Sequence, residues 1–239
     1  MTLITGGASG IGAAIARRMA GKGRKVVIAD KDRSRGNEVA AEIGARFVPA
    51  DVTRPEDNKA AVAEAISAYG RLDVAVFNAG IPGQCGWHNF TPAAYRTTVS
   101  TNLDGVVYGI HACLPHLRGH GSIIVTSSLA GLKEAPDPFY AASKHALVGL
   151  VRSTATLLAR DGVKVNALCP GLVDTPLLAP YREPLTEAGH AFADPDEAAD
   201  AVETILTGGR TGEAWVVLSG RPAYPVRFPD VTTNTMGDR

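Results

Sequence analysis

A tyrosine and a lysine stand four positions apart near the start of a helical pattern, in the stretch FYAASKHALVGL at residues 139–150. This spacing puts Tyr140 and Lys144 on one face of a helix, so that the ammonium lies near the phenol. A free phenol has a pKa of about 10 and is a poor base at neutral pH, and a nearby positive charge lowers that pKa. The pair either begins a helix and nothing more or performs general acid/base chemistry, with Tyr140 transferring the proton.

A glycine-rich turn follows the first apolar run of the chain, in the sequence TGGASGIG at residues 5–12. Gly6, Gly10 and Gly12 allow a tight turn, close packing of helix on strand, and approach of backbone N–H groups to a phosphate. The spacing is GxxxGxG rather than GxGxxG, and it does not match the GxxxxGK[ST] loop of nucleoside triphosphatases. The turn therefore predicts a site for a dinucleotide pyrophosphate, and a plain tight turn is the alternative interpretation.

An acidic residue closes the second apolar run, KVVIAD, 18 residues beyond Gly12. At this place the carboxylate of Asp30 can accept hydrogen bonds from the ribose hydroxyls of an adenosine, and it repels a 2′-phosphate. Asp30 therefore favours NAD over NADP, a preference that Lys31, Arg33 and Arg35 nearby soften. The alternative role for Asp30 is capping of the helix that follows.

The elements that position these residues alternate between short apolar runs and helical patterns, which is typical of βαβ units and a parallel sheet buried on both faces. With 239 residues and 45% apolar composition the chain is long enough for one large domain. We therefore expect a single-domain α/β fold with a doubly wound parallel sheet of about seven strands. The predicted strands span residues 3–5, 25–30, 45–50, 73–78, 122–127, 164–169 and 214–219.

Two helical patterns are longer than the others, at residues 92–118 and 139–160, and the first is expected to break near Thr98–Thr101. Two segments look irregular, residues 80–91 and 175–193, and the second is predicted to be a short lid over the substrate. Residues 221–239, with three prolines, are expected to form an extended C-terminal tail. The first strand begins almost at Met1 and is unusually short, which raises the expectation that a few native residues precede it.

The charges balance, with 24 Lys plus Arg against 24 Asp plus Glu, and they are scattered along the chain. Such a chain has no field that attracts nucleic acid or anionic lipid, and no apolar window is long enough to span a bilayer. Three widely separated cysteines, Cys85, Cys113 and Cys169, fit reduced thiols in the cytoplasm. His116 and His120 lack a ligand pattern around them, so we expect no metal site.

Six motifs occur in one order over nearly the whole chain, and together they resemble the short-chain dehydrogenase/reductase family. A single match would be weak, but the combination is highly specific. The motifs are TGGASGIG at 5–12, NAG at 78–80, Asn102, SSLAG at 127–131, YAASK at 140–144 and PGLVDT at 170–175.

The resemblance implies a catalytic set. Tyr140 would be the general acid/base, Ser128 would donate a hydrogen bond to the substrate oxygen, and Lys144 would hold the nicotinamide ribose and lower the phenol pKa. Asn102 would support the lysine through ordered water. The interval from Ser128 to Tyr140 is 12 residues, one fewer than usual, so counting back from the tyrosine selects Ser127 instead. We prefer Ser128 because the flanking GSIIVTSSLAG matches the family frame.

The resemblance also implies a cofactor groove along the carboxyl ends of the strands. It assigns residues to the pyrophosphate, the adenosine ribose, the adenine, the ribose path and the nicotinamide in turn. The residues for the pyrophosphate are Gly6, Ser9, Gly10, Ile11 and Gly12, and the residue for the adenosine ribose is Asp30. The residues for the adenine are Asp51 and Val52, and those for the ribose path are Asn78 and Gly80, with Tyr140 and Lys144. The residues for the nicotinamide are Pro170, Val173 and Thr175.

The function that follows is an NAD-dependent oxidoreductase that interconverts a secondary alcohol and a ketone. Apolar walls are expected from the 83–88 loop, Leu129, residues 135–139 and Leu172, with Trp87 either in the pocket or in ordinary loop packing. A homotetramer or homodimer is expected through residues 102–118 and 139–160. The alternatives are an NADPH-dependent ketoreductase of thioester-bound or steroid-like ketones, and a non-catalytic NAD(H)-sensing or scaffold protein.

Overall fold

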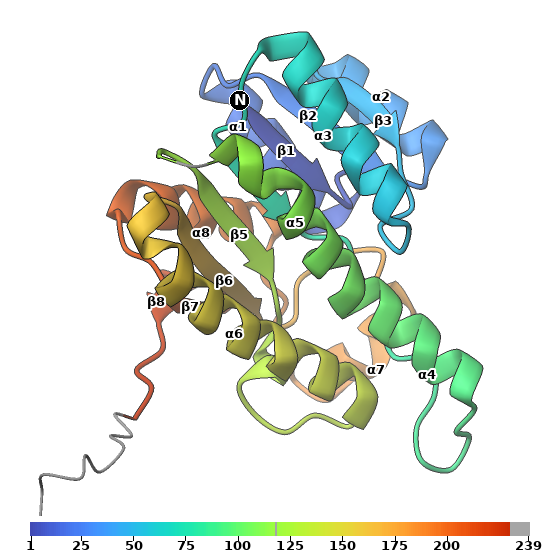
Figure 1. Ribbon diagram of the computed structural model, residues 1–239. Coiled ribbons are helices and arrows are strands. Elements are labelled where there is room, and N and C mark those ends of the chain that lie inside the picture. Colours follow the sequence, from blue (N-terminus) through green and yellow to red (C-terminus); the bar gives the residue numbers. More distant parts are fainter. Residues whose placement is uncertain (118, 230–239) are drawn as a thin grey trace, which may run out of the picture.

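Seven parallel strands lie side by side in the order β3-β2-β1-β4-β5-β6-β7 (Figure 1). The computed structural model describes residues 1–117 and 119–229, and in these the predicted seven-strand sheet is confirmed with boundaries shifted by at most two residues. Six of the strands are short apolar runs buried on both faces, because helices cover both faces of the sheet. The strands are β1 Thr2–Thr5, β2 Val26–Asp30, β3 Arg46–Pro49, β4 Val74–Phe77, β5 Ser122–Thr126, β6 Lys164–Pro170 and β7 Ala214–Val217.

An eighth strand, β8 at Tyr224–Pro225, pairs antiparallel with β7 and was not predicted. It belongs to the segment expected to be an extended tail, and its two residues carry no strand pattern of their own. Phe228 then packs beneath the guanidinium of Arg152, 4.1 Å from the ring centroid. The tail therefore follows the sheet edge and one helix as far as residue 229, and residues 230–239 of the predicted tail lie outside the described residues.

Helices cover both faces of the sheet (Figure 1). One face carries α1, α2 and α8, whose buried residues Ile15, Val39 and Val202 share one core cluster. The other face carries α3, α5 and α6, and α4 and α7 lie near the carboxyl ends of the strands. The helices are α1 Gly10–Gly21, α2 Arg33–Ile43, α3 Pro55–Tyr69, α4 Pro92–Val99, α5 Gly105–Leu117, α6 Pro138–Leu158, α7 Arg182–Glu187 and α8 Pro195–Gly208.

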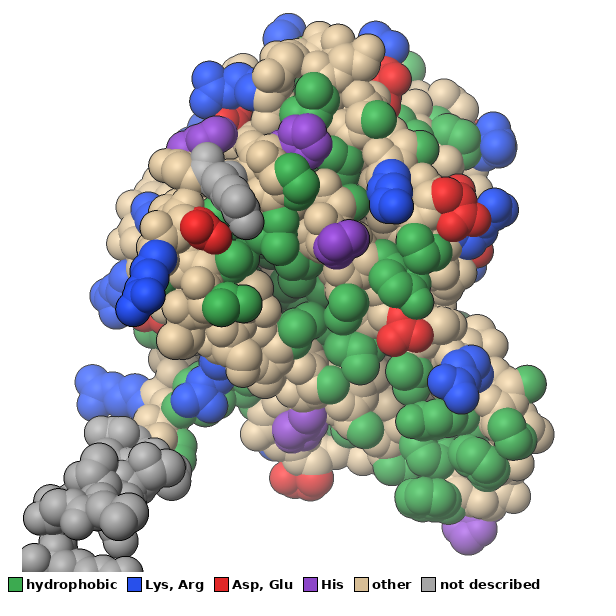
Figure 2. All heavy atoms as spheres, viewed as in Figure 1, with side chains coloured by type: hydrophobic (Ala, Val, Ile, Leu, Met, Phe, Trp, Pro, Cys, Tyr) green, Lys and Arg blue, Asp and Glu red, His purple; other side chains and the backbone are tan. Residues whose placement is uncertain are grey.

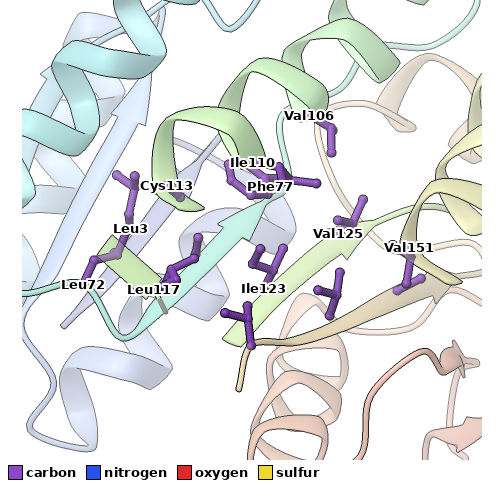
Figure 3. Packing of buried hydrophobic residues seen from close by; sticks show 14 of the residues in the cluster. Leu3, Leu72, Phe77, Val106, Ile110, Cys113, Leu117, Ile123, Val125 and Val151 are labelled. Atoms are coloured by element: carbon purple, nitrogen blue, oxygen red, sulfur yellow. The ribbon is translucent and has the colours of Figure 1, made fainter. Parts of the chain in front are cut away.

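The core beneath α5 fixes the strand that leads into the site (Figure 3). Phe77, the last residue of β4, is 2% exposed and lies among Val106, Ile110 and Val125. Gly109 of α5 faces its ring, and a Cβ at that position would clash with it. Burial of one such side chain stabilises the fold by about 1.5–3 kcal/mol, which holds the end of β4 in place.

The long helical pattern at residues 92–118 divides where the sequence predicts a break. Helix α4 ends at Val99, a π-helical turn spans Ser100–Asp104, and α5 begins at Gly105. A π-helical turn widens the backbone spiral and is frequent at functional sites. Here it carries Asn102, whose side chain is fully buried.

The strand order reverses between β1 and β4, because the chain proceeds from β1 to β2 and β3 on one side and from β4 to β7 on the other. Crossover connections leave the sheet in opposite directions at this point, and their divergence opens a crevice at the carboxyl ends of the strands. The loops after β1 to β6 all open at this edge, and the residues predicted for the site lie in these loops or on the helices that follow them.

Candidate active site

The glycine turn after β1 is built so that no side chain blocks its approach to the crevice. Gly6 and Gly10 have φ angles of 66° and 51°, in the left-handed region that favours glycine. A Cβ on Gly6 would lie 2.7 Å from the Cα of Ala79, and a Cβ on Gly12 would clash with the carbonyl oxygen of Gly6. The turn is therefore more than an ordinary reversal, because three glycines are needed for its backbone to lie this close to the neighbouring strand.

Helix α1 begins directly behind this turn. Ser9 precedes it in an extended conformation, and its side chain makes no capping hydrogen bond. The first turn of a helix leaves N–H groups without helical partners, and these favour an anion. Ile11 follows, half-buried, and Gly12 is buried. These residues fit the pyrophosphate of a dinucleotide, since the backbone cradle is open and the helix terminus faces it.

Asp30 ties the glycine turn to the end of β2. One carboxylate oxygen accepts a hydrogen bond from the Ala8 backbone N–H at 3.0 Å, and the other accepts from the Asp32 N–H, also at 3.0 Å. The N-cap of α2 is Asp32, which accepts from the Arg35 N–H at 3.1 Å. The alternative interpretation of Asp30 as the helix cap is therefore wrong, and its carboxylate stays at the mouth of the crevice.

The two residues predicted beside the adenine follow β3. The exposed carboxylate of Asp51 accepts hydrogen bonds from the backbone N–H and the hydroxyl of Thr53, at 3.0 and 2.8 Å. Val52 is buried against Gly105, where a Cβ would lie 2.8 Å from its methyl group. The backbone N–H of Ala50 donates to the carbonyl of Asp30 at 2.9 Å, which brings this loop beside the end of β2.

Asn78 joins three strands at the switch point. Its amide nitrogen donates to the carbonyl of Gly6 at 3.0 Å, and its amide oxygen accepts from the hydroxyl of Thr126 at 3.2 Å. Its backbone N–H donates to the hydroxyl of Thr5 at 3.1 Å. The loops after β1, β4 and β5 are therefore locked together by one side chain.

Asn102 fixes the loop after β4. Its side-chain amide exchanges two hydrogen bonds with the backbone of Ile81, at 2.8 and 3.0 Å, and lies 3.4 Å from the hydroxyl of Ser143. Gly80 separates Asn102 from Lys144: a Cβ on this glycine would lie 3.3 Å from the asparagine amide oxygen and 3.4 Å from the lysine Nζ. The two polar side chains therefore meet across a residue that has no side chain.

Lys144 is 4% exposed, and its Nζ donates a hydrogen bond to the carbonyl of Thr126 at 3.0 Å. The Nζ lies 5.6 Å from the centroid of the Tyr140 ring, on the shared helix face that the four-residue spacing predicts. Burial lowers the pKa of Lys144 to about 8. A lysine with this pKa changes protonation state near physiological pH, which an exposed lysine does not.

The phenol of Tyr140 does not have the lowered pKa expected from its lysine neighbour. Burial raises the pKa of Tyr140, the nearby hydroxyl of Ser128 opposes that rise, and the negative charge of Asp137 adds to it. The physical reason is that the free-energy cost of removing the phenolate from water exceeds the stabilisation of the phenolate by the neighbouring groups of the protein. Tyr140 is thus protonated in the described structure, as a general acid requires.

The two adjacent serines have different partners. The hydroxyl of Ser127 is 3% exposed and donates to the carbonyl of Lys144 at 2.8 Å, inside helix α6. The hydroxyl of Ser128 is half-buried, accepts from the Ala130 N–H at 3.1 Å, and lies close enough to the Tyr140 phenol to lower its pKa. Of the two candidates, only Ser128 has its oxygen beside the phenol.

The segment after β6 closes the crevice. Pro170 ends the strand, Val173 is buried and bridges to Ala193, and Thr175 places its methyl group against the glycine turn, 3.0 Å from a Cβ built on Gly10. Residues 175–193, the predicted lid, contain a short turn and helix α7 between these fixed ends. The lid residue Arg182 pairs with Asp174 and lies 5.4 Å from the ring centroid of Phe192.

A hollow of about 300 Å³ lies where two predicted substrate walls meet. Its lining comes from the loop after β4 and from the residues before α6: Gly83, Gln84, Cys85, Gly86, Asn89, Pro136 and Asp137. A larger hollow, of about 430 Å³, lies between α3 and α5, is lined by Val62, Ile66 and Ala112 among others, and contains none of the polar residues described above. We therefore associate the smaller hollow with the site.

Aromatic side chains gather beside this hollow. Trp87 is 72% exposed and meets Phe139 edge-on, with ring centroids 4.8 Å apart, and Phe90 and Tyr95 contact the same phenylalanine at 5.5 and 5.2 Å. Figure 2 shows hydrophobic side chains collected at the lower right, where Figure 1 places α4 and the loop before it. Trp87 thus packs on the residue directly before Tyr140.

Thr126 was not predicted from the sequence, and Asp137 was predicted only as part of the substrate wall at residues 135–139. Thr126 accepts from Lys144 and donates to Asn78, and Asp137 accepts hydrogen bonds from the first turn of α6. A signal for the cap at Asp137 was present, because an aspartate directly before a proline is typical of the start of a helix. Among residues 1–117 and 119–229, no metal-binding group of three ligands occurs and no helix is long and apolar enough to cross a membrane.

The fold and this polar cluster define a class of protein, the α/β oxidoreductases of the dinucleotide-binding type. A family model described as short chain dehydrogenase matches residues 1–186. The chain belongs to the short-chain dehydrogenase family, as the six sequence motifs predict.

Individual relatives agree with this assignment. The chain is 38% identical to a 3-alpha-(or 20-beta)-hydroxysteroid dehydrogenase of Mycobacterium tuberculosis, over 93% of the chain and 89% of the relative. It is 34% identical to a cyclohexanol dehydrogenase of an Acinetobacter strain, over 91% and 92%.

Solved structures give the same fold. A 3-ketoacyl-(acyl-carrier-protein) reductase from Brucella melitensis, complexed with NADH, superposes with a TM-score of 0.85 at 31% identity, over 92% of this chain and 97% of the other. A short chain dehydrogenase from Burkholderia cenocepacia in complex with NADP has a TM-score of 0.85 at 31% identity, over 92% and 96%. These neighbours include complexes with both forms of the nicotinamide cofactor.

Proposed function

We propose that this protein is an NAD(H)-dependent dehydrogenase that interconverts a secondary alcohol and a ketone. The observation that carries the proposal is the contact between Ser128 and Tyr140 at the end of a groove that begins with the glycine turn and passes Lys144. We propose that a dinucleotide lies along this path, with its nicotinamide end beside the two hydroxyls.

In the proposed mechanism the bound cofactor supplies or accepts the hydride, and the protein handles the proton and the geometry. Ser128 donates a hydrogen bond to the substrate oxygen, and Tyr140 protonates that oxygen in reduction or accepts its proton in oxidation. The Ser128 oxygen accepts from the Ala130 N–H, so its own O–H is left available as a donor to the substrate oxygen.

Lys144 and Asn102 support the pair. We propose that the Lys144 ammonium holds the nicotinamide ribose hydroxyls and helps the phenol to ionise when the groove is filled. Its burial and its bond to the Thr126 carbonyl support a fixed position. Asn102 keeps the loop after β4 against the π-helical turn, and we retain for it the role of anchoring a water chain to the lysine.

We propose that the remaining residues of the groove contact the parts of the cofactor that the family resemblance assigns to them. The glycine turn with Ser9 and Ile11 serves the pyrophosphate, Asp51 and Val52 flank the adenine, and Asn78 with Gly80 follows the ribose path. Pro170, Val173 and Thr175 line the nicotinamide end. The support is that all of them border one continuous edge of the sheet.

For the cofactor we propose NAD rather than NADP. The carboxylate of Asp30 is held by two backbone N–H groups beside the glycine turn, so its charge cannot readily move away from a 2′-phosphate. The runner-up is an NADPH-dependent ketoreductase. Lys31, Arg33 and Arg35 near Asp30 favour it, as does the likeness to a structure in complex with NADP.

Substitution of serine for Asp30 is expected to narrow the preference for NAD by roughly tenfold or more, because a fixed like charge is removed from the 2′-phosphate position. The measurement is kcat/KM for NAD and for NADP with one alcohol. Asp32→Ser is the matched control, since serine still caps α2 and the charge that is lost does not touch the glycine turn. An unchanged cofactor ratio in Asp30→Ser would show that the ribose assignment is wrong.

For the substrate we propose an apolar secondary alcohol or ketone, such as a steroid or an alicyclic ring. The aromatic group with Trp87 and the short lid support an apolar, open-ended site. The polar side chains of the neighbouring hollow, Gln84, Asn89 and Asp137, are available to the surroundings of the substrate oxygen. Relatives named for hydroxysteroids and cyclohexanol support the same class. Spectroscopic assays of NAD and NADP reduction against steroid, alicyclic, aromatic and sugar alcohols test it, and activity confined to sugar alcohols would contradict it.

We further propose a homo-oligomer, a tetramer or dimer, in the cytoplasm, with contacts through α5 and α6. Four apolar residues of these helices, Val106, Ile110, Leu147 and Val151, are buried in the subunit's own core and are not available for such contacts. The support comes from apolar side chains that stay exposed on these helices, Val107 at 42% and Leu157 at 76%. Light scattering of the purified protein measures the oligomeric state, and a monomer would contradict the proposal.

A further inference from the structure

Helix α6 begins with a carboxylate that holds the main chain of the tyrosine. Asp137 is the N-cap, and one of its oxygens accepts hydrogen bonds from the backbone N–H of Phe139 at 3.1 Å and of Tyr140 at 2.8 Å. Pro138, between them, has no N–H to offer. The first turn of α6 is thus satisfied by a single side chain, and Tyr140 is the third residue of that turn.

The other side of the same carboxylate faces the loop after β4. Gly83 packs so closely that a Cβ there would clash with the Asp137 carboxylate. Asp137 also lines the hollow of about 300 Å³ between the two predicted substrate walls. The carboxylate therefore links three parts of the site: the loop after β4, the hollow and the backbone of Tyr140.

Few charges face the Tyr140 phenol. In the described part of the chain they are Asp137 at the start of α6 and Lys144 one turn further on, with the buried thiol of Cys169 on β6 behind the lysine. Lys133 and Glu134, in the loop before α6, lie 3.6 Å from each other. Asp137 is the one acidic group among those that act on the phenol, and its negative charge opposes phenolate formation.

We propose that Asp137 is a positioning residue for the proposed reaction: it fixes the backbone of Tyr140 and places a negative charge at the hollow between the loop after β4 and the start of α6. This inference rests on the proposed function of Tyr140 as acid/base. It assigns to Asp137 a role beyond helix capping, and the two contributions are separable because asparagine and serine also cap helices but carry no charge.

The test is a set of variants in which the cap is kept and the charge is removed. In Asp137→Asn and Asp137→Ser the Tyr140 phenol should ionise at lower pH, because the like charge that opposed the phenolate is gone. The pH profiles of alcohol oxidation and of ketone reduction should both shift to lower pH. At pH values below the rise of the wild-type profile, kcat/KM for alcohol oxidation should increase roughly two- to fivefold. Ketone reduction should be lost at a lower pH than in the wild type.

Asp194→Asn is the matched control. Asp194 is also the N-cap of a helix whose next residue is proline, and it lies on α8 rather than on α6. Both asparagine variants should therefore change Tm by a similar small amount, and only Asp137→Asn should change the titration of Tyr140. An equal change of that titration in Asp194→Asn would overturn the inference.

Titration of Tyr140 is measured without turnover, by NMR of protein that contains isotope-labelled tyrosine. The chain has six tyrosines, and the signal of Tyr140 is the one missing from Tyr140→Phe. If Asp137→Asn and Asp137→Ser titrate like the wild type, or at higher pH, Asp137 has no electrostatic role and the inference fails. If the wild type oxidises no alcohol, the proposed function fails, while the NMR titration still decides on Asp137.

Discussion

Substitution of phenylalanine for Tyr140 is expected to lower kcat roughly 10³-fold while NADH binding stays nearly unchanged. The phenol hydroxyl is the group that exchanges a proton with the substrate oxygen, so its loss removes a step that no described neighbour can replace. Ser128 has no acidic proton at neutral pH, and Lys144 is turned to the Thr126 carbonyl at 3.0 Å. The phenyl ring keeps the packing between α6 and the crevice, so the groove itself should persist.

The measurement is kcat for alcohol oxidation and ketone reduction, together with the Kd for NADH from fluorescence. Tyr69→Phe is a suitable control, because it removes the hydroxyl of a tyrosine on α3, on the outer side of the sheet. It should leave kcat and Kd as they are. Residual activity within about tenfold of the wild type would remove Tyr140 from the role of acid/base, and weakened NADH binding with normal kcat would give it a purely binding role.

Much of this site follows from local sequence, because parallel strands carry strong signals. Each of the seven strands is a short apolar run bounded by turn residues, and the carboxyl ends of such strands meet at one edge. The glycine turn, Asp30, Asn78 and Tyr140 were therefore predictable together. The break before α5 was predictable as well, and the family resemblance implied a place for Asn102 in the site, although the π-helical form of the turn was not predicted.

Contacts between distant segments account for what the sequence did not predict. Strand β8 has two residues, and only the edge of β7 makes it a strand. The raised pKa of Tyr140 depends on burial, which arises from the packing of α6 against the rest of the site. The clash that a side chain at Gly83 would cause with Asp137 joins residues 54 positions apart. The four-residue spacing alone suggested a lowered pKa for Tyr140, because it places the charge of Lys144 near the phenol. The spacing gives no information on the cost of removing the phenolate from water.

The choice between the two serines depends on the same kind of contact. Interval counting selects Ser127 and the flanking motif selects Ser128, and the sequence offers no further criterion. In the structure the Ser127 hydroxyl donates to the backbone of α6, whereas the Ser128 hydroxyl reaches the phenol. A residue whose hydroxyl is already committed within the core cannot at the same time donate to a substrate.

Alanine at position 128 is therefore expected to lower kcat by roughly 10²- to 10³-fold, because the hydrogen bond to the developing charge on the substrate oxygen is lost. Alanine at position 127 should leave kcat within about threefold of the wild type and cost about 1 kcal/mol of unfolding free energy, since a buried hydrogen bond to the Lys144 carbonyl disappears. The two variants differ by one position and by the same single oxygen atom. Each is thus the matched control for the other.

The decisive measurement is the pair of values, kcat and the free energy of unfolding, for both variants. We expect the activity loss to be larger at position 128 and the stability loss to be larger at position 127, because the first hydroxyl faces the crevice and the second faces the core. A reversed order of the kcat values would make Ser127 the catalytic serine. In that case helix α6 would have to shift so that the Ser127 hydroxyl leaves the Lys144 carbonyl and reaches Tyr140 when substrate binds.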